Sequence, residues 1–157
     1  MKMSEGVEWA LHCCLTLVWL GDTGAVPTAR LAKGFELPAA YLNKFLQALV
    51  KARILTSSAG VKGGFRLARP PEKITLLDVV TAIEGREDVF QCTEIRRRGA
   101  GCKADARDFA RPCGIAAAMR RAEAAWRREL AQQTIADLNR TVPARSVERV
   151  RQWHAAN

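Results

Sequence analysis

The sequence has few of the residues on which most enzymes depend. Two histidines, His12 and His154, occur among its 157 residues, and aromatic residues make up 6% of the chain. It has no recognisable set of nucleophile, base and orienting residue, no phosphate-binding glycine loop and no metalloprotease helix motif. We therefore expect no enzymatic activity.

Long hydrophobic runs are also missing. The most apolar stretch, Trp9 to Leu20, is interrupted by His12 and preceded by Glu5 and Glu8, so it is too short to cross a bilayer. It also lacks the layout of a signal peptide. We expect a cytoplasmic protein with no membrane partner.

Acidic residues are scarce relative to basic ones. Lysine and arginine total 25 against 16 acidic residues, which gives a net charge of +9 and a pI near 9.9. This balance favours a nucleic acid as partner, although positive charge also serves simply to keep a protein soluble. The length allows one domain with an appendage, and the alanine-rich second half predicts a mainly helical protein.

Five cysteines occur in the chain. Disulfides are rare in the reducing cytoplasm, so the cysteines point to metal binding or redox chemistry.

The first helix is expected over Ser4 to Leu20, with Ser4 as its N-cap. Its apolar stripe consists of Val7, Leu11, Cys14 and Val18. Cys14 belongs to this stripe, so we expect it to be a core residue. Cys13 points away from the stripe, and so away from the expected core, and has no evident role.

Two further helices follow closely. Pro27 opens a short helix through Lys33 that Gly34 closes, and Pro38 starts a third helix. The buried face of the third helix recurs at a three-four spacing: Leu42, Phe45, Leu46 and Leu49. The pair fits a helix-turn-helix and equally an ordinary antiparallel helix pair.

The next segment favours the helix-turn-helix. Two short strands, Ile54 to Ser58 and Phe65 to Ala68, are joined by a glycine-rich link that carries Lys62. With the neighbouring arginines Arg53, Arg66 and Arg69, this hairpin reads as a basic wing.

The rest of the chain predicts three further segments. A helix is expected over Ile74 to Glu84, with Leu77, Val80 and Ile83 facing inward, and it completes a winged helix at 1–85. Residues 86–114 are expected to form a long loop. A long helix over 115–140 carries an apolar stripe that packs either on a second copy, as a dimerisation helix, or back on its own core. The tail, 141–157, has no clear pattern. The fold class is thus mainly α with a small β-wing.

Two segments carry a specific family resemblance: TARLAKGFELPAAYLNKFLQALVKARIL from Thr28 and KGGFRLARPPEKITLLDVVTAIEG up to Gly85. They resemble the winged-helix regulators of the IscR and NsrR family, which sense iron-sulfur status, nitric oxide or redox state. The segments VEWALHCC and CTEIRRRG resemble in particular the redox-sensitive RsrR type.

This resemblance implies a [2Fe-2S] cluster at a homodimer interface, held by Glu8 and His12 of one subunit and by Cys92 and Cys113 of the other, so the long loop is expected to bind the cluster. Glu8 and His12 are four residues apart on a helix, so their side chains emerge on one face about 6 Å apart along its axis. Taken alone, each would be an ordinary surface residue. Three-cysteine relatives space their ligands about half as far apart as Cys92, Cys102 and Cys113, so a cluster that includes Cys102 is the lesser alternative.

We therefore predict a redox-sensing DNA-binding transcriptional regulator, in the repressor role, that binds double-stranded promoter DNA as a homodimer. The alternatives are a cluster-free regulator that senses thiol oxidation or a small molecule, and an electron-transfer or zinc protein with incidental basicity. Expected DNA contacts come from the two helices and the wing: Thr28, Ala39, Ala40, Tyr41, Lys44, Lys62 and Arg66.

Overall fold

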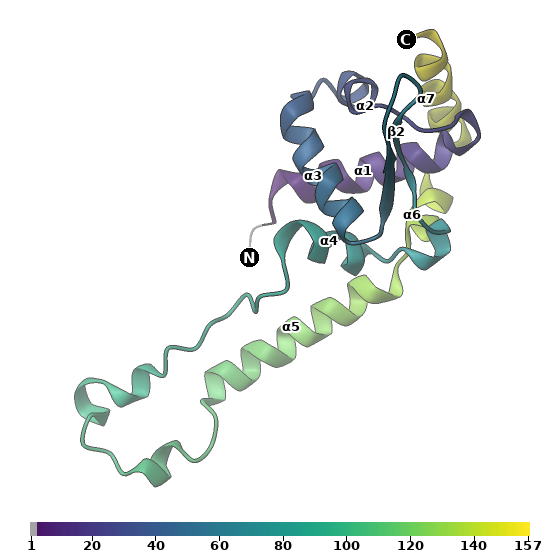
Figure 1. Cartoon of the computed structure of the whole chain (residues 1–157). Coiled ribbons are helices and arrows are strands. Elements are labelled where there is room, and N and C mark those ends of the chain that lie inside the picture. Colours follow the sequence, from purple (N-terminus) through teal and green to yellow (C-terminus); the bar gives the residue numbers. More distant parts are fainter. Residues whose placement is uncertain (1–2) are drawn as a thin grey trace. The chain divides into compact units, whose positions relative to one another are not determined.

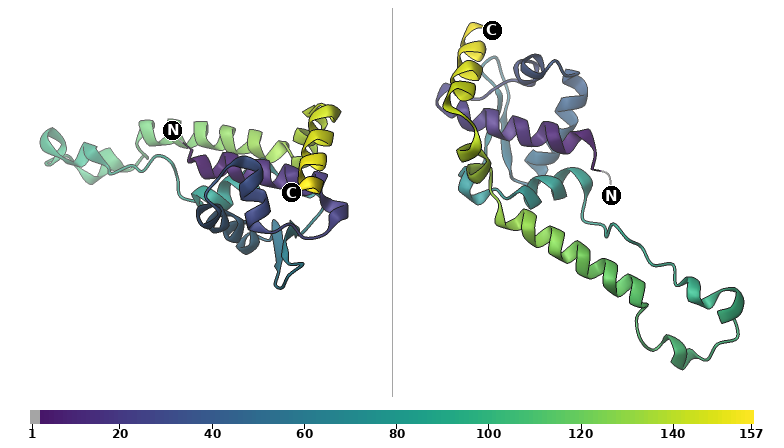
Figure 2. Two further views of the ribbon diagram at one scale, coloured as in Figure 1. Left: turned by 90° about the horizontal axis from the view of Figure 1, so that it is seen from above. Right: turned by 180° about the vertical axis from the view of Figure 1, so that it is seen from behind.

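The computed structural model describes residues 3–157, with the side chain of Asp22 left out. The chain divides into two compact units, one formed by 3–85 with Leu130–Asn157 and the other by Arg86–Glu129. The helices and strands, drawn in Figures 1 and 2, are α1 Glu5–Trp19, α2 Thr28–Phe35, α3 Ala39–Lys51, β1 Leu55–Ser58, β2 Gly64–Leu67, α4 Leu76–Glu84, α5 Gly114–Gln132, α6 Ile135–Thr141 and α7 Ala144–Ala156.

Helix α1 is the centre of the first unit, because α3, α4 and α6 all pack against it. Burial therefore covers more of its circumference than the predicted stripe. Val7 and Cys14 are buried as expected, but Leu11 and Val18 are only partly buried. Cys13, which was expected to point away from the core, is fully buried.

Ser4 precedes α1 without capping it. Its backbone N–H and its hydroxyl both donate to Oε1 of Glu84, at 2.8 and 2.6 Å. The predicted N-cap hydrogen bond is absent because the Ser4 hydroxyl joins the beginning of α1 to the end of α4.

The helix-turn-helix is present as α2 and α3, which pack against each other. The predicted face of α3, with Leu42, Leu46 and Leu49, is fully buried. The end of α2 differs from the prediction: the helix runs past Gly34, and Glu36 adopts the left-handed conformation at its end, with φ 53°. A Cβ at Gly34 would lie 3.3 Å from the imidazole of His154, so this glycine makes room for α7.

Strands β1 and β2 form the predicted antiparallel hairpin, in register Leu55↔Leu67 to Ser58↔Gly64. The hairpin projects from the helices of this unit (Figure 2). Backbone hydrogen bonds between Val26 and Phe65, at 3.0 and 2.9 Å, attach it to the segment before α2. Gly64 has φ 148°, and a Cβ there would lie 2.3 Å from the carbonyl carbon of Val26, so the attachment requires glycine.

The expected single helix over 115–140 is interrupted. Thr134 caps α6 through a capping box with Asp137, and Ile135 donates its N–H to the carbonyl of Ile74 at 2.9 Å. These bonds end α5 at Gln132 and place Ile135 in the core of the first unit. The winged helix is therefore not complete at residue 85, and this part of the chain packs on its own core.

Helix α7 was not predicted. It follows Pro143 and packs against α1 and α2 through residues that include the buried His154. The predicted loop is confirmed: 86–113 contains only short 3-10 turns and returns to the beginning of α5 (Figure 1). No helix within residues 3–157 is long and apolar enough to cross a membrane.

Candidate functional site

The predicted DNA-contacting residues lie on α2, on α3 and on the wing. Ala39, Ala40, Tyr41 and Lys44 are exposed on the first turns of α3. The wing exposes Lys62 at its turn and Arg66 on β2. Basic side chains therefore stand at both parts of a winged helix that face DNA.

Thr28 is engaged inside the helix-turn-helix. Its hydroxyl donates to Oδ1 of Asn43 at 3.1 Å and so joins the first turn of α2 to α3. Sequence reasoning singled out Thr28 as a DNA contact and missed Asn43. The structure shows the pair as a side-chain link between α2 and α3.

Tyr41 is half exposed and packs with one side against two other aromatic rings. Its ring centroid lies 5.5 Å from that of Trp9 and 4.9 Å from that of Phe45, both nearly edge to face. Trp9 also meets Phe45 at 5.9 Å. A Cβ at Gly6 would lie 2.4 Å from the Phe45 ring, so a glycine is needed where α1 and α3 approach. The aromatic cluster formed by Trp9, Tyr41 and Phe45 thus joins α1 directly to α3.

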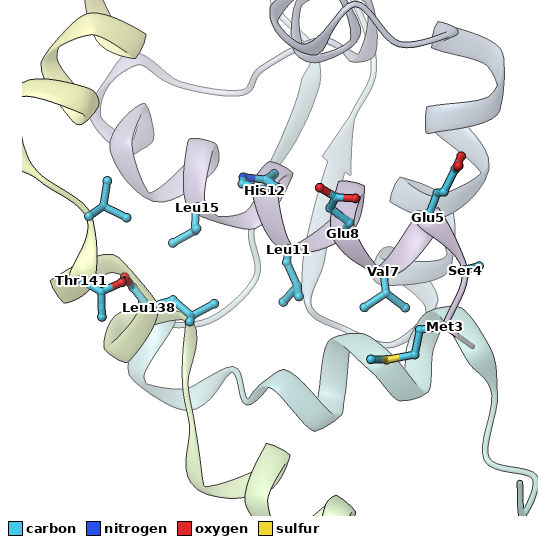
Figure 3. A pocket seen from close by; sticks show the side chains of 11 residues that line it. Met3, Ser4, Glu5, Val7, Glu8, Leu11, His12, Leu15, Leu138 and Thr141 are labelled. Carbon is cyan, nitrogen blue, oxygen red and sulfur yellow. The ribbon is translucent and has the colours of Figure 1, made fainter. Parts of the chain in front are cut away.

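Glu8 and His12 are exposed on one side of α1, one turn apart. Both line an open, mainly apolar pocket of about 570 Å³, whose other walls include Val7, Leu11 and Leu138 (Figure 3). The imidazole of His12 lies 5.8 Å from the ring of Phe35, centroid to centroid. The two polar side chains therefore border an apolar groove that is open to solvent.

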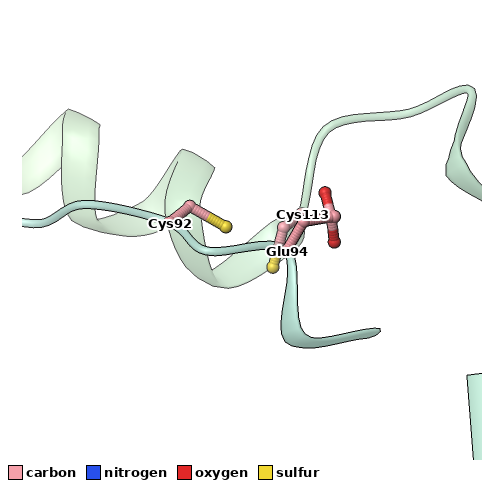
Figure 4. Close-up of side chains that lie close together, drawn as sticks. All are labelled: Cys92, Glu94 and Cys113. Atoms are coloured by element: carbon pink, nitrogen blue, oxygen red, sulfur yellow. The ribbon is translucent and has the colours of Figure 1, made fainter. Parts of the chain in front are cut away.

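Cys92 and Cys113 are brought together in the second unit. Their Sγ atoms and a carboxylate oxygen of Glu94 all lie within 4.8 Å of one another (Figure 4). Cys113 immediately precedes α5, where the backbone N–H groups of Ala116 and Ile115 donate to its sulfur. These bonds lower the pKa of the Cys113 thiol, and the Arg96 guanidinium and the Cys92 thiol act in the same direction.

Glu94 is a donor that sequence reasoning missed. Arg96 holds its carboxylate in a two-pronged ion pair, with Nε to Oε1 at 2.5 Å and Nη2 to Oε2 at 3.0 Å. Hydrogen bonding by Arg96 also lowers the pKa of Glu94, so this carboxylate is ionised near neutral pH. The signal was present in the segment CTEIRRRG, where the acid follows Cys92 by two residues.

The remaining cysteines lie apart from this group. Cys102 is exposed in the same loop and is not part of the three-donor group. Burial raises the pKa of both Cys13 and Cys14 to about 12, so neither offers a thiolate near neutral pH.

The two thiols, Cys92 and Cys113, have the chemistry of two of the four protein ligands of an iron-sulfur cluster. Thiolates are the usual protein ligands of such clusters, and Cys113 is held where its thiolate is favoured. Glu8 and His12 offer one carboxylate and one imidazole on an accessible face.

Helix α5 carries an apolar stripe that the second unit leaves partly uncovered. Ile115 is 67% and Met119 is 42% exposed.

Comparisons with known proteins agree with this architecture. The profile of the Rrf2 family, described as an iron-dependent transcriptional regulator, matches residues 3–141. YffB of Lactococcus lactis, named as an HTH-type transcriptional regulator, is 30% identical over 138 residues, which cover 88% of this chain and 86% of YffB. YwgB of Bacillus subtilis, also named as an HTH-type transcriptional regulator, is 36% identical over 91 residues. The matched region covers 58% of this chain and only 58% of the length of YwgB.

Two solved structures show the same fold. CymR, the global cysteine regulator of B. subtilis, matches with a TM-score of 0.65 at 20% identity, over 91% of this chain and 99% of CymR. IscR of T. potens matches with a TM-score of 0.62 at 19% identity, over 88% and 85%. The expected winged helix and the expectation of a regulator rather than an enzyme are thereby confirmed.

Proposed function

The chain belongs to the Rrf2 family of transcriptional regulators, and from this premise we propose that it is a redox-responsive repressor. In this proposal a homodimer binds promoter DNA, and its affinity depends on a [2Fe-2S] cluster. Glu8 and His12 of one protomer hold the cluster together with Cys92 and Cys113 of the partner subunit.

The proximity of Cys92 and Cys113 is the observation that carries the proposal. Two thiols more than twenty residues apart in sequence meet at the beginning of α5, where the backbone N–H groups favour the thiolate of Cys113. A [2Fe-2S] cluster takes four protein ligands, and replacing two thiolates by other donors raises its reduction potential, as in Rieske centres. Glu8 and His12 supply the two further donors that this pair lacks.

A second copy is the partner that we propose for the exposed stripe on α5. Ile115 and Met119 are large apolar side chains on a helix that otherwise carries many arginines. Burying such a stripe against the same chain is the usual route to a symmetric dimer. Light scattering of the purified protein tests this part, because a mass of one chain contradicts it.

The DNA-binding part rests on α3 and the wing. Lys62 and Arg66 supply sequence-independent attraction to phosphates. The small residues Ala39 and Ala40 let α3 approach the bases closely, and Lys44 adds a donor on the same helix. Thr28 and Asn43 hold α2 and α3 together at this surface.

The redox signal reaches DNA through α1. When bound, the cluster supplies a reversible one-electron change of charge beside Glu8 and His12. Trp9, the neighbour of Glu8, packs on Tyr41 and Phe45, so a displacement of α1 is transmitted to α3. Because a dimer must fit two half-sites at once, small movements of α3 change its affinity strongly.

The experiment is a binding measurement on anaerobically prepared full-length protein. A duplex selected from a random library is titrated by fluorescence anisotropy with oxidised and with chemically reduced protein. We expect the two affinities to differ at least tenfold. Equal affinities, measured on protein that contains iron and sulfide, contradict redox control.

The short distance between Cys92 and Cys113 also favours a second candidate function. The same pair is suited to reversible thiol oxidation without any cluster. In that case anaerobically prepared protein is colourless and free of iron, and its DNA affinity changes when a disulfide reagent oxidises the thiols.

A further inference from the structure

Cys92, Glu94 and Cys113 form a three-donor group within one chain. Cys92 and Glu94 lie on the loop and Cys113 at the beginning of α5, and the donor atoms lie within 4.8 Å of one another. Figure 4 shows the three side chains gathered at this point. The proposed cluster uses the two thiolates of this group and leaves Glu94 without a role.

The carboxylate of Glu94 is held in place for binding. Arg96 occupies one lone pair on each oxygen, and each oxygen keeps a second one. Arg96 is anchored in turn, because it donates to the carbonyl of Arg111 at 3.3 Å and lies over the ring of Phe109. An orienting partner of this kind is what metal-ligating carboxylates usually have.

We propose that Cys92, Glu94 and Cys113 bind one divalent ion of the zinc type within a single protomer. Thiolate and carboxylate are ordinary zinc ligands, and three protein ligands leave a fourth position for water. The two thiolates and the carboxylate carry three negative charges, which the ion and the Arg96 guanidinium balance.

The ion and the cluster compete for the same thiolates. A protomer that holds the ion cannot offer Cys92 and Cys113 to a partner. This competition rests on the proposed function, whereas the ion site itself requires only residues of the loop and of α5.

Cobalt binding to the full-length protein tests the site. Protein freed of metal under anaerobic conditions is titrated with Co²⁺, whose thiolate charge-transfer and visible d–d bands report the ligands. We expect one Co²⁺ per chain, displaced by Zn²⁺. Cys92→Ser and Cys113→Ser each remove about half of the charge-transfer intensity.

Glu94→Gln is the decisive variant, because it keeps the size and polarity of the side chain. We expect it to weaken Co²⁺ binding by at least about 10–100-fold, because the loss of an outer-shell partner of a metal ligand already costs that much. The matched controls are Glu87→Gln, an exposed glutamate of the same unit, and Cys102→Ser, an exposed thiol of the same loop. Both bind Co²⁺ like the unaltered protein.

Three results overturn the proposal: unchanged affinity of Glu94→Gln, equal loss in Cys102→Ser, or loss of Co²⁺ binding in the double variant Glu8→Ala/His12→Ala. The double variant separates this proposal from the previous one. It is expected to lose the iron-sulfur cluster and to keep Co²⁺ binding in full.

Discussion

The indole of Trp9 meets the ring of Tyr41 edge to face, with centroids 5.5 Å apart and planes at 88°. The contact joins the helix that carries Glu8 and His12 to the helix on which Lys44, a proposed DNA contact, is exposed. Aromatic pairs of this geometry contribute about 0.5–1.5 kcal/mol beyond the area they bury. The contact therefore adds to the packing that joins α1 and α3, and in our proposal it is the link between them.

Replacing Trp9 by alanine is predicted to uncouple DNA affinity from the redox state. The substitution removes the contacts with Tyr41 and Phe45 and, since Trp9 is half-buried, lowers the free energy of unfolding by about 2 kcal/mol. Anisotropy titrations of oxidised and reduced protein are expected to give nearly equal affinities. Trp9→Phe is the control that keeps an aromatic ring; an undiminished redox ratio in Trp9→Ala would argue against α1 as the link.

Gly64→Ala is predicted to detach the wing. A Cβ there meets the backbone of Val26 in a conformation that side chains rarely adopt, so we expect urea denaturation to show a loss of about 3 kcal/mol or more. Gly60→Ala, at φ 99° but with open space around it, is the matched control and should cost about 1–2 kcal/mol. Equal losses for the two variants would show that the attachment to Val26 does not matter.

Lys62→Ala and Arg66→Ala are predicted to weaken DNA binding for every sequence alike. Each removes an exposed positive charge of the wing and should reduce the slope of log K against log salt concentration by about 1. Lys73→Ala, which removes an exposed lysine outside the wing, serves as control. Unchanged slopes in both wing variants would remove the wing from the DNA interface.

The thiol of Cys113 is predicted to react at lower pH than an ordinary cysteine. Hydrogen bonds from the N–H groups of Ala116 and Ile115 favour its thiolate, so the pH midpoint of alkylation should lie below the ordinary value of 9.0. Arg96→Gln removes a nearby positive charge and should shift the midpoint upward. Peptide mapping of metal-free protein alkylated at a series of pH values measures this directly.

The same alkylation experiment tests the burial of Cys13 and Cys14. Since burial raises the pKa of both thiols to about 12, neither should be alkylated in the folded protein below about pH 9. Both should react once the protein is unfolded. Rapid labelling of Cys13 in the native state would contradict its place in the core.

Local patterns in the sequence predicted those elements whose buried residues lie on a single face. The three-four spacing of Leu42, Leu46 and Leu49 identified the buried face of α3, and the glycine-rich link located the wing. Cys13 was misplaced because α1 is buried over more of its circumference than one stripe describes. Gly34 resembled a helix end, but in the structure it lies inside α2, where a Cβ would lie 3.3 Å from His154 of a distant part of the chain.

The candidate site could be predicted only in part, for a similar reason. Glu8 and His12 are neighbours on one helix, so their spacing alone places them on one face. The meeting of Cys92 with Cys113 depends on how a long aperiodic loop closes, which local patterns do not encode. The place of Glu94 beside the two thiols depends on its ion pair with Arg96. The sequence does not say which of the three neighbouring arginines, Arg96, Arg97 or Arg98, pairs with it.

The iron and sulfide content of the double variant Glu8→Ala/His12→Ala tests the central claim most directly. Protein is prepared anaerobically, its absorption spectrum is recorded, and Glu5→Ala, which alters another exposed acid of α1, is treated in parallel. The account predicts that Glu5→Ala keeps the cluster of the unaltered protein and that the double variant is nearly free of iron and sulfide. An intact cluster in the double variant would contradict it.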